Sequence, residues 1–294
     1  CSDFWSEELN NVDKKHTNII SNFNNVYKNN IKKFSRDIID WNYHSDNGCP
    51  FQISKYHLKY FSVSKLFYES LKEIYKIMIN DRFDKSSFMD DVSIIKKTNA
   101  YDLLTEFPAH LNNLRKNLYF VEKNISVNYR WLRYIYISNI ILKKKLISSN
   151  KTWVDIGSYY GGIQGIVKSK IPDTTLILVD FNHQLCRSYI YLKNLFPNAN
   201  HIFPKEVQSI SNIDEIKIGS ILYVKASDFD LIKNFKVNLV TNFFSFGEMK
   251  RKIFNNYFNS KLINESENIY LINRFVSSPF FEKTYDTDIN IFEI

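Results

Sequence analysis

The chain has 294 residues, of which 44% are hydrophobic and 24% charged, and its formal net charge is +8. This length holds one large or two ordinary domains, and the composition excludes fibrous and fully disordered proteins. The lysines are scattered among Asp and Glu, which argues against a nucleic-acid-binding surface. An acidic partner, such as a nucleotide sugar, an anionic glycan or a membrane surface, stays open.

Cysteine use and hydropathy bear on the compartment. Cys1, Cys49 and Cys186 are too few and too separated for a disulfide framework, and no Cys/His spacing suits zinc. No apolar run reaches the roughly 18 residues of a transmembrane helix, and no signal peptide is recognisable. We therefore expect a cytoplasmic protein without a transmembrane segment. Because the sequence starts at Cys1 and not at Met, we expect it to be a fragment of a longer chain.

The first half of the chain is predicted to be mainly α-helical. Ser62–Ile79 and Asn128–Ile147 carry apolar residues at helical spacing, whereas Ser45–Pro50 and Thr105–His110 carry turn residues. We interpret residues 1–149 as a helical region on the acceptor side of a site or as its lid.

From residue 150 the pattern changes to short apolar runs that alternate with helical stretches, which favours a doubly wound parallel sheet. The predicted strands are Thr152–Ile156, Thr175–Asp180, Ser220–Val224, Val237–Phe243 and Asn268–Asn273. The predicted helices between them are Gly162–Lys170, Gln184–Phe196 and Glu248–Leu262. We therefore predict a Rossmann-like α/β domain over residues 150–294.

Four of the seven glycines fall in the stretch TWVDIGSYYGGIQG, Thr152–Gly165, directly after the first predicted strand. Ligands of such sheets bind outside the carboxyl ends of the strands, where the strand order reverses. We assign Gly157 and Gly161 to a ligand site and Gly165 to close packing of a helix on the sheet.

The spacing of acidic residues suggests a nucleoside-containing cofactor. Asp180 ends the second predicted strand, 25 residues after Asp155, where an acid accepts hydrogen bonds from ribose hydroxyls. A dinucleotide motif beginning at Gly157 would need glycine at Tyr159, which disfavours close approach of a pyrophosphate. An acid two residues before the first glycine is frequent in enzymes that use S-adenosylmethionine (SAM), and Asp155 and Gly157 fit that pattern.

The second half resembles the bacterial sugar O-methyltransferases of surface-polysaccharide gene clusters. The likeness is carried by VDIGSYYGG, VDFNHQLCRSYIYLKNLFPNA, NLVTNFFSFGEM and YLINRF, with NYRWLRYIYISNIIL upstream, and extends over roughly Asn128–Phe275. It implies a class I SAM-dependent methyltransferase fold and methyl transfer to a sugar hydroxyl.

Three features depart from that family. Tyr159 stands at a position that is usually glycine, and with Tyr160 it either flanks SAM or plugs the sheet edge. Asn238 stands where an acid commonly precedes the fourth strand. Few residues follow YLINRF, so we expect an abbreviated or truncated sheet to which Asp288–Ile294 supplies one last strand.

Catalytic and acceptor-binding residues are expected at the ends of the fourth and fifth strands. Glu248 is the first candidate for general base, although SFGE is also a capping-box pattern. Asn242 either orients the acceptor or ties down a loop. Ser245 and Asn273 are candidates for acceptor binding, and Arg274 either binds an anionic acceptor or forms a surface salt bridge.

Four further residues complete the predicted site. His183 either covers the cofactor, acts as an alternative base or is simply solvated. Ser227 and Asp228 follow the third main strand and either meet the adenine amino group or cap a helix. Phe181, next to Asp180, is included in the cofactor-binding set, and no metal ligand is predicted.

The sequence therefore predicts a SAM-dependent O-methyltransferase acting on a sugar, a nucleotide sugar or a glycan precursor, with peripheral contact to membrane-bound glycan machinery left open. Two alternatives stay open. One is an NAD-dependent oxidoreductase or epimerase of nucleotide sugars, which Tyr159 disfavours. The other is a catalytically degenerate binding or scaffold module of a larger glycan-assembly protein.

Overall fold

The computed structural model describes residues 88–107, 119–122, 125–127, 129–249 and 251–273. These residues belong to two compact units. Along the chain, the boundary between the units falls between Asn139 and Ile140, inside helix α7 (Tyr129–Lys143). The boundary near residue 150 stays a prediction. The predicted helix Ser62–Ile79 and the predicted last strand Asp288–Ile294 lie outside the described residues.

The described residues of the unit that ends at Asn139 form helices and one hairpin. Residues 88–97 are helical, α6 follows at Ala100–Glu106, and β1 (Tyr119–Glu122) pairs antiparallel with β2 (Ile125–Val127). The sequence pattern did not predict this hairpin, because strands of four and three residues are too short to establish an alternating pattern.

Buried aromatic groups join the helices of this unit. The indole Nε1 of Trp131, on α7, donates a hydrogen bond to the carbonyl oxygen of Phe107 over 2.8 Å. Both side chains are buried, so the indole proton has its partner inside the core.

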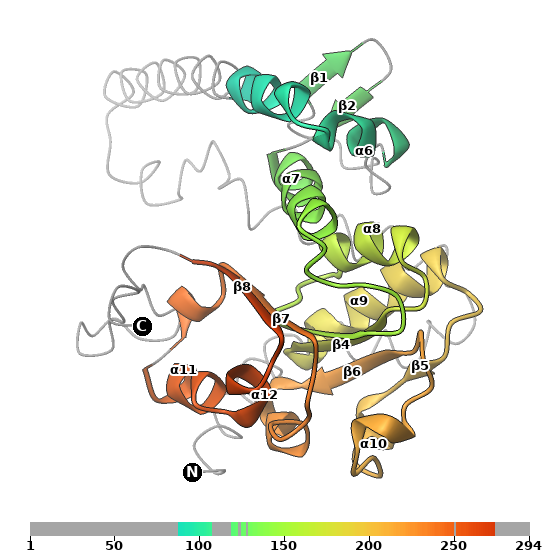
Figure 1. Ribbon diagram of the computed structural model, residues 1–294, viewed down its shortest axis with the longest axis vertical. Helices are drawn as coiled ribbons and strands as arrows, with labels where there is room; N and C mark the ends of the chain where they lie inside the picture. Colours follow the sequence, from blue (N-terminus) through green and yellow to red (C-terminus); the bar gives the residue numbers. More distant parts are fainter. Residues whose placement is uncertain (1–87, 108–118, 123–124, 128, 250, 274–294) are drawn as a thin grey trace, which may run out of the picture. The chain divides into compact units, whose positions relative to one another are not determined.

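The unit that begins at Ile140 contains a six-stranded, all-parallel sheet in the order β5-β6-β4-β3-β7-β8 (Figure 1). Its strands are β3 (Thr152–Ile156), β4 (Thr175–Asp180), β5 (His201–Ile202), β6 (Ile221–Lys225), β7 (Leu239–Phe243) and β8 (Asn268–Ile272). Its helices are α8 (Gly162–Lys170), α9 (Asn182–Leu195), α10 (Pro204–Val207), α11 (Arg251–Phe258) and α12 (Lys261–Asn264). Its described residues also form three 3-10 helices: η1 (Ile213–Glu215), η2 (Ala226–Leu231) and η3 (Phe246–Glu248). The predicted α/β class with a parallel, Rossmann-like sheet is confirmed.

Side-chain alternation along β3 shows how the sheet is covered on both faces. Val154 and Ile156 belong to a core that also contains Phe254 of α11, whereas Asp155 on the opposite face meets Gln164 of α8. In Figure 1, α8 and α9 lie on one side of the strands and α11 and α12 on the other. Burial on both faces explains why the strands have continuous apolar runs.

The single helix predicted over Glu248–Leu262 is wrong. The chain forms α11 and α12 instead, and Ser260 separates them by accepting a hydrogen bond from the N–H of Ile263 at the start of α12. Serine at a helix N-cap competes with helix continuation, and the apolar spacing alone did not reveal that.

The strand order reverses at β3. The chain crosses from β3 to β4 on one side, and later returns from β6 to β7 on the other side. In folds of this architecture, ligands bind in a crevice outside the carboxyl ends of the strands at this reversal, which here are the ends of β3 and β7.

Candidate functional site

The turn after β3 has a left-handed backbone at three positions. The φ angles are +81° at Gly157, +52° at Tyr159 and +81° at Gly161. The N–H of Gly157 donates to the carbonyl oxygen of Val179 over 2.7 Å, which holds the turn against β4. Gly157 and Gly161 allow the turn, and their contact with a ligand stays a prediction; Tyr159 adopts the same conformation without being glycine.

Three of the four glycines of the motif, Gly157, Gly161 and Gly165, also face a close neighbour. A Cβ atom at Gly157 would lie 2.1 Å from the Oγ of Ser245, so the turn after β3 touches the turn after β7. A Cβ at Gly161 would meet Leu192, and one at Gly165 would lie 2.7 Å from Tyr191 on α9. Gly165 does serve close packing, but of α8 on α9 and not of a helix on the sheet as predicted. Gly161 combines a left-handed turn with packing on α9.

Asp180 ends β4 beside this turn. Its Oδ2 accepts a hydrogen bond from the N–H of Tyr159 over 2.6 Å, and its Oδ1 accepts one from the N–H of Phe181 over 2.7 Å. Burial is the largest influence on its pKa and raises it to about 7, while the two N–H groups and the Arg187 guanidinium favour the ionised form. The negative charge of Glu248 also raises this pKa, so Glu248 lies within electrostatic reach of Asp180.

Asp155 points into the protein and not toward the crevice. Its side chain is 2% exposed, and its oxygens accept hydrogen bonds from the Gln164 amide and the Thr241 hydroxyl. Burial raises its pKa to about 7, and the charge of Asp180 adds to that increase. In this geometry Asp155 joins β3, α8 and β7 beneath the turn, and a direct contact with a cofactor stays a prediction.

Asn242 and Ser245 tie the turn after β7 to the end of β3. The Asn242 amide donates to the carbonyl oxygen of Ile156 over 2.6 Å and to the Ser245 hydroxyl, and its oxygen accepts from the N–H of Phe246 over 3.0 Å. Asn242 is fully buried. These bonds match the loop-tying alternative for Asn242, and its contact with an acceptor stays a prediction.

Glu248 ends η3, and Ser245 is the N-cap of that short helix. The Ser245 side chain makes no capping hydrogen bond, because its hydroxyl is engaged with Asn242 and Ile156. The capping-box alternative is therefore wrong for the hydrogen bond that the Ser245 side chain would accept. Asn273 lies next to η3, where its side-chain oxygen accepts from the N–H of Gly247 over 3.3 Å, and Arg274 lies outside the described residues.

His183 lies in the first turn of α9 and is 4% exposed, so the solvated-loop alternative is wrong. Its ring stacks on Phe181, with centroids 5.8 Å apart and planes at 9°. Ser227 is exposed and donates to the Asp228 carboxylate over 2.9 Å. Neither residue caps η2, whose N-cap is Lys225, so the helix-cap alternative for them is also wrong.

The sequence did not single out the side chains that support the turn. Ser158 is 5% exposed, and its hydroxyl has no hydrogen-bond partner among the described residues. Arg187 is buried beside Asp180, and Gln164 and Thr241 hold Asp155. The only available signal was helical spacing, which places Gln164 and Arg187 on the sheet-facing sides of α8 and α9.

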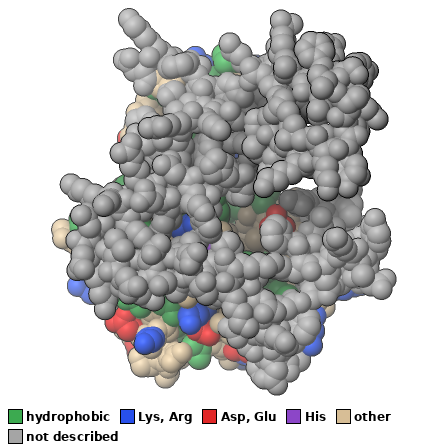
Figure 2. All heavy atoms as spheres, turned by 180° about the vertical axis from the view of Figure 1, so that it is seen from behind, with side chains coloured by type: hydrophobic (Ala, Val, Ile, Leu, Met, Phe, Trp, Pro, Cys, Tyr) green, Lys and Arg blue, Asp and Glu red, His purple; other side chains and the backbone are tan. Residues whose placement is uncertain are grey.

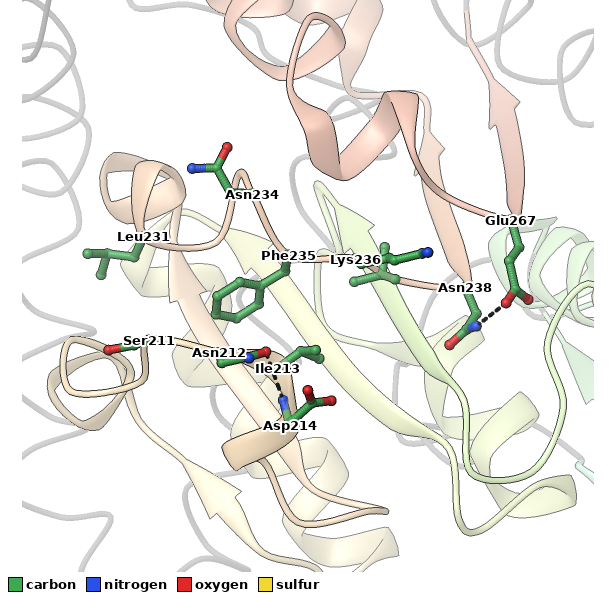
Figure 3. Close-up of a pocket in the computed structure, with 11 residues that line it drawn as sticks. Ser211, Asn212, Ile213, Asp214, Leu231, Asn234, Phe235, Lys236, Asn238 and Glu267 are labelled. Atoms are coloured by element: carbon green, nitrogen blue, oxygen red, sulfur yellow. Dashed lines mark hydrogen bonds between the residues drawn. The ribbon is translucent and has the colours of Figure 1, made fainter.

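A separate pocket of about 570 Å³ lies at the opposite, amino edge of the sheet (Figure 3). Its lining includes Asn238, which precedes β7, and Glu267, which precedes β8. Asn238 accepts from the N–H of Thr152 over 2.9 Å and donates to Glu267 over 2.7 Å, so these groups join strands. The pocket is remote from the crevice and does not share its residues.

Three general properties of the described residues bear on possible ligands: surface charge, metal-ligating side chains and helix hydropathy. On the face seen in Figure 2, basic and acidic side chains of the described residues lie next to one another. No grouping of three His, Cys, Asp or Glu residues suited to a metal occurs in the described ranges. None of the helices described is long and apolar enough to cross a membrane.

Comparison with known proteins finds no protein-family model that matches the chain and no curated protein that matches its sequence.

Proposed function

We propose that the α/β unit binds SAM in the crevice beyond β3, β4 and β7 and transfers its methyl group to a hydroxyl of a sugar or glycan precursor. The observation that carries this proposal is Asp180, whose carboxylate is positioned at the switch point against the left-handed turn Gly157–Gly161. The resemblance of the sequence motifs to sugar O-methyltransferases supports the choice of reaction.

Asp180 is suited to a ribose diol. Each carboxylate oxygen accepts one backbone N–H and retains capacity for a second hydrogen bond. The two ribose hydroxyls would supply those bonds, and the ionised form of Asp180 would be the one that accepts them.

Ser158 and the start of α8 are suited to an anionic group. The Ser158 hydroxyl is buried without a partner, and the first N–H groups of a helix carry partial positive charge. These groups would hold the carboxylate of the methionine portion of SAM.

The chemistry needs placement of the acceptor and removal of one proton. SAM supplies the methyl group, which leaves the sulfur as the bond to the acceptor oxygen forms. We assign Glu248 to accept the hydroxyl proton, because it lies at the same edge as Asp180 and is half-buried. Asn273 and Ser245 are candidates for positioning the acceptor.

Calorimetric titration with SAM, S-adenosylhomocysteine and NAD tests the cofactor. We expect wild-type protein to bind SAM and S-adenosylhomocysteine, and Asp180→Ala to weaken both by roughly 10- to 100-fold, the effect of losing hydrogen bonds to a charged group. Asp214→Ala, an exposed carboxylate at the amino edge, is the matched control and should leave both affinities unchanged. Binding of NAD alone would favour the oxidoreductase, and binding of none of the three would favour a scaffold module.

Glu248→Gln tests the reaction. If Glu248 accepts the proton, turnover on a panel of methyl glycosides should fall by about 100-fold or more while SAM affinity is retained. Turnover close to that of the wild type would remove Glu248 from the mechanism, and His183 would then be the next residue to test.

A further inference from the structure

Four non-glycine residues in the described ranges have a left-handed backbone: Lys145, Asn150, Tyr159 and Phe244. Lys145 follows the end of α7, where helices commonly end in this conformation, and asparagine tolerates it better than most residues. Neither explanation applies to Tyr159 and Phe244, which do not follow a helix end and are not asparagine. For such side chains this conformation costs about 1–2 kcal/mol.

Both aromatic residues lie at the switch point. Tyr159 is two residues beyond Gly157 in the turn after β3, and Phe244 directly precedes Ser245 in the turn after β7. Because Ser245 packs against Gly157, the two turns touch. The two strained positions therefore lie in turns that touch each other at the carboxyl ends of β3 and β7.

The surrounding structure holds each residue in place. The N–H of Tyr159 donates to Asp180, and its carbonyl oxygen accepts a hydrogen bond from the Ser188 hydroxyl. The N–H of Phe244 donates to the carbonyl oxygen of Ile272 over 2.6 Å. Backbone strain that is fixed from several directions occurs preferentially at ligand sites, where it pre-organises side chains.

We propose that Tyr159 and Phe244 are ligand-contacting residues whose aromatic rings favour the positively charged sulfonium of SAM over its neutral product. This inference rests on the proposed function. Both residues are half-buried, so part of each remains accessible. A cation near an aromatic face is attracted by the ring, and the attraction is stronger where water is excluded. The neutral thioether of S-adenosylhomocysteine lacks that attraction, so the pair would favour release of the product after transfer.

The test measures affinity for SAM and for S-adenosylhomocysteine in Tyr159→Gly and Phe244→Leu. Each substitution should weaken SAM binding by about 2- to 30-fold, the range expected for a cation beside one ring, and change S-adenosylhomocysteine binding much less. Tyr159→Gly relieves the backbone strain but also removes the ring contact with Tyr160, whose centroid lies 5.2 Å away, so Tm is measured to verify that the variant is folded.

Two controls separate ligand contact from strain alone. Lys145→Gly relieves the same strain outside the site, so it should raise Tm and leave both affinities unchanged. Tyr159→Phe keeps the ring and should retain the preference for SAM.

The possible failures are distinguishable. If Asp180→Ala weakens both ligands but Tyr159→Gly and Phe244→Leu leave the SAM preference unchanged, the aromatic pair has no such role and the proposed function stands. If the wild type binds neither ligand, or if Asp180→Ala changes nothing, the proposed function fails and this inference fails with it.

Discussion

The two edges of the parallel sheet use the same kinds of side chain for different purposes. At the amino edge, Lys168 is 2% exposed and its Nζ donates to three carbonyl oxygens, those of Pro172, Thr174 and Gly219, over 2.6–2.9 Å. Asn238 likewise joins β3 to Glu267. Lys168 and Asn238 thus have all these partners at the amino edge, whereas the buried Thr174 hydroxyl there has none among the described residues.

The carboxyl edge has carboxyl groups with raised pKa values, a buried hydroxyl without a partner and two strained backbone positions. Asp155 and Asp180 have raised pKa values, the Ser158 hydroxyl is buried without a partner, and Tyr159 and Phe244 are left-handed. Satisfied groups contribute to stability, whereas unsatisfied groups and raised pKa values are typical of sites that bind ligands. The amino edge is distinguished by the dense hydrogen bonding of Lys168, and the carboxyl edge by raised carboxylate pKa values beside strained aromatic residues. The proposed site therefore lies at the carboxyl edge.

The largest fall in the free energy of unfolding is expected for Lys168→Ala. It leaves three carbonyl oxygens without their donor, and the free energy of unfolding should fall by roughly 3–5 kcal/mol. SAM affinity of the folded fraction should not change. Lys168→Met retains the apolar stem and separates lost packing from lost hydrogen bonds. A fall of less than about 1 kcal/mol in urea unfolding would contradict the role given to Lys168.

The next largest fall in the free energy of unfolding is expected for Asn242→Ala. The amide is fully buried and makes bonds to Ile156, Ser245 and Phe246, so its removal should cost about 2–3 kcal/mol. Unlike Lys168→Ala, it should also weaken SAM binding, because Ser245 would no longer be held against Gly157. Unchanged affinity in the folded variant would separate the turn after β7 from the site.

The pH dependence should have opposite sign at the two edges. Folded Asp155 and Asp180, with pKa values near 7, hold protons that the unfolded chain has released, so stability falls as the pH rises from about 4 to about 7. Burial lowers the pKa of Lys168 to about 8, so its contribution to stability rises with pH from about 8 to about 10.5.

Asp155→Asn tests the predicted fall in stability between about pH 4 and about pH 7. The decline of stability with pH should become shallower than in the wild type by up to about 1.4 kcal/mol per pH unit, the maximum for one proton. The measurement is the urea midpoint between pH 4 and pH 8. Equal slopes in the two proteins would mean that Asp155 titrates at its ordinary pKa.

The smallest effect is expected for Asn238→Ala. Asn238 is half-buried and bonds the N–H of Thr152 and the Glu267 carboxylate, so its loss should cost about 1 kcal/mol in chemical denaturation. Because it lies at the amino edge, calorimetry should find SAM affinity unchanged. Reduced affinity would show that the two edges are coupled.

The sequence by itself determined five of the six strands of the parallel sheet, the turn after β3 and the place of Asp180 at the end of β4, but not the two-residue strand β5. These follow from local properties: continuous apolar runs mark strands buried on both faces, and glycine marks left-handed turns. The break between α11 and α12 was missed, although Ser260 carried a local signal that competed with the apolar spacing.

Only the tertiary structure decided what the polar side chains do. Asp155 bonds Thr241, and Asn242 bonds Ile156, each across 86 positions of the chain. No pattern within a short window contains such partners, so the sequence could not tell that Asp155 faces inward or that Asn242 holds a loop. The unpartnered Ser158 hydroxyl was equally invisible, because a missing partner is defined only when the chain has folded around it.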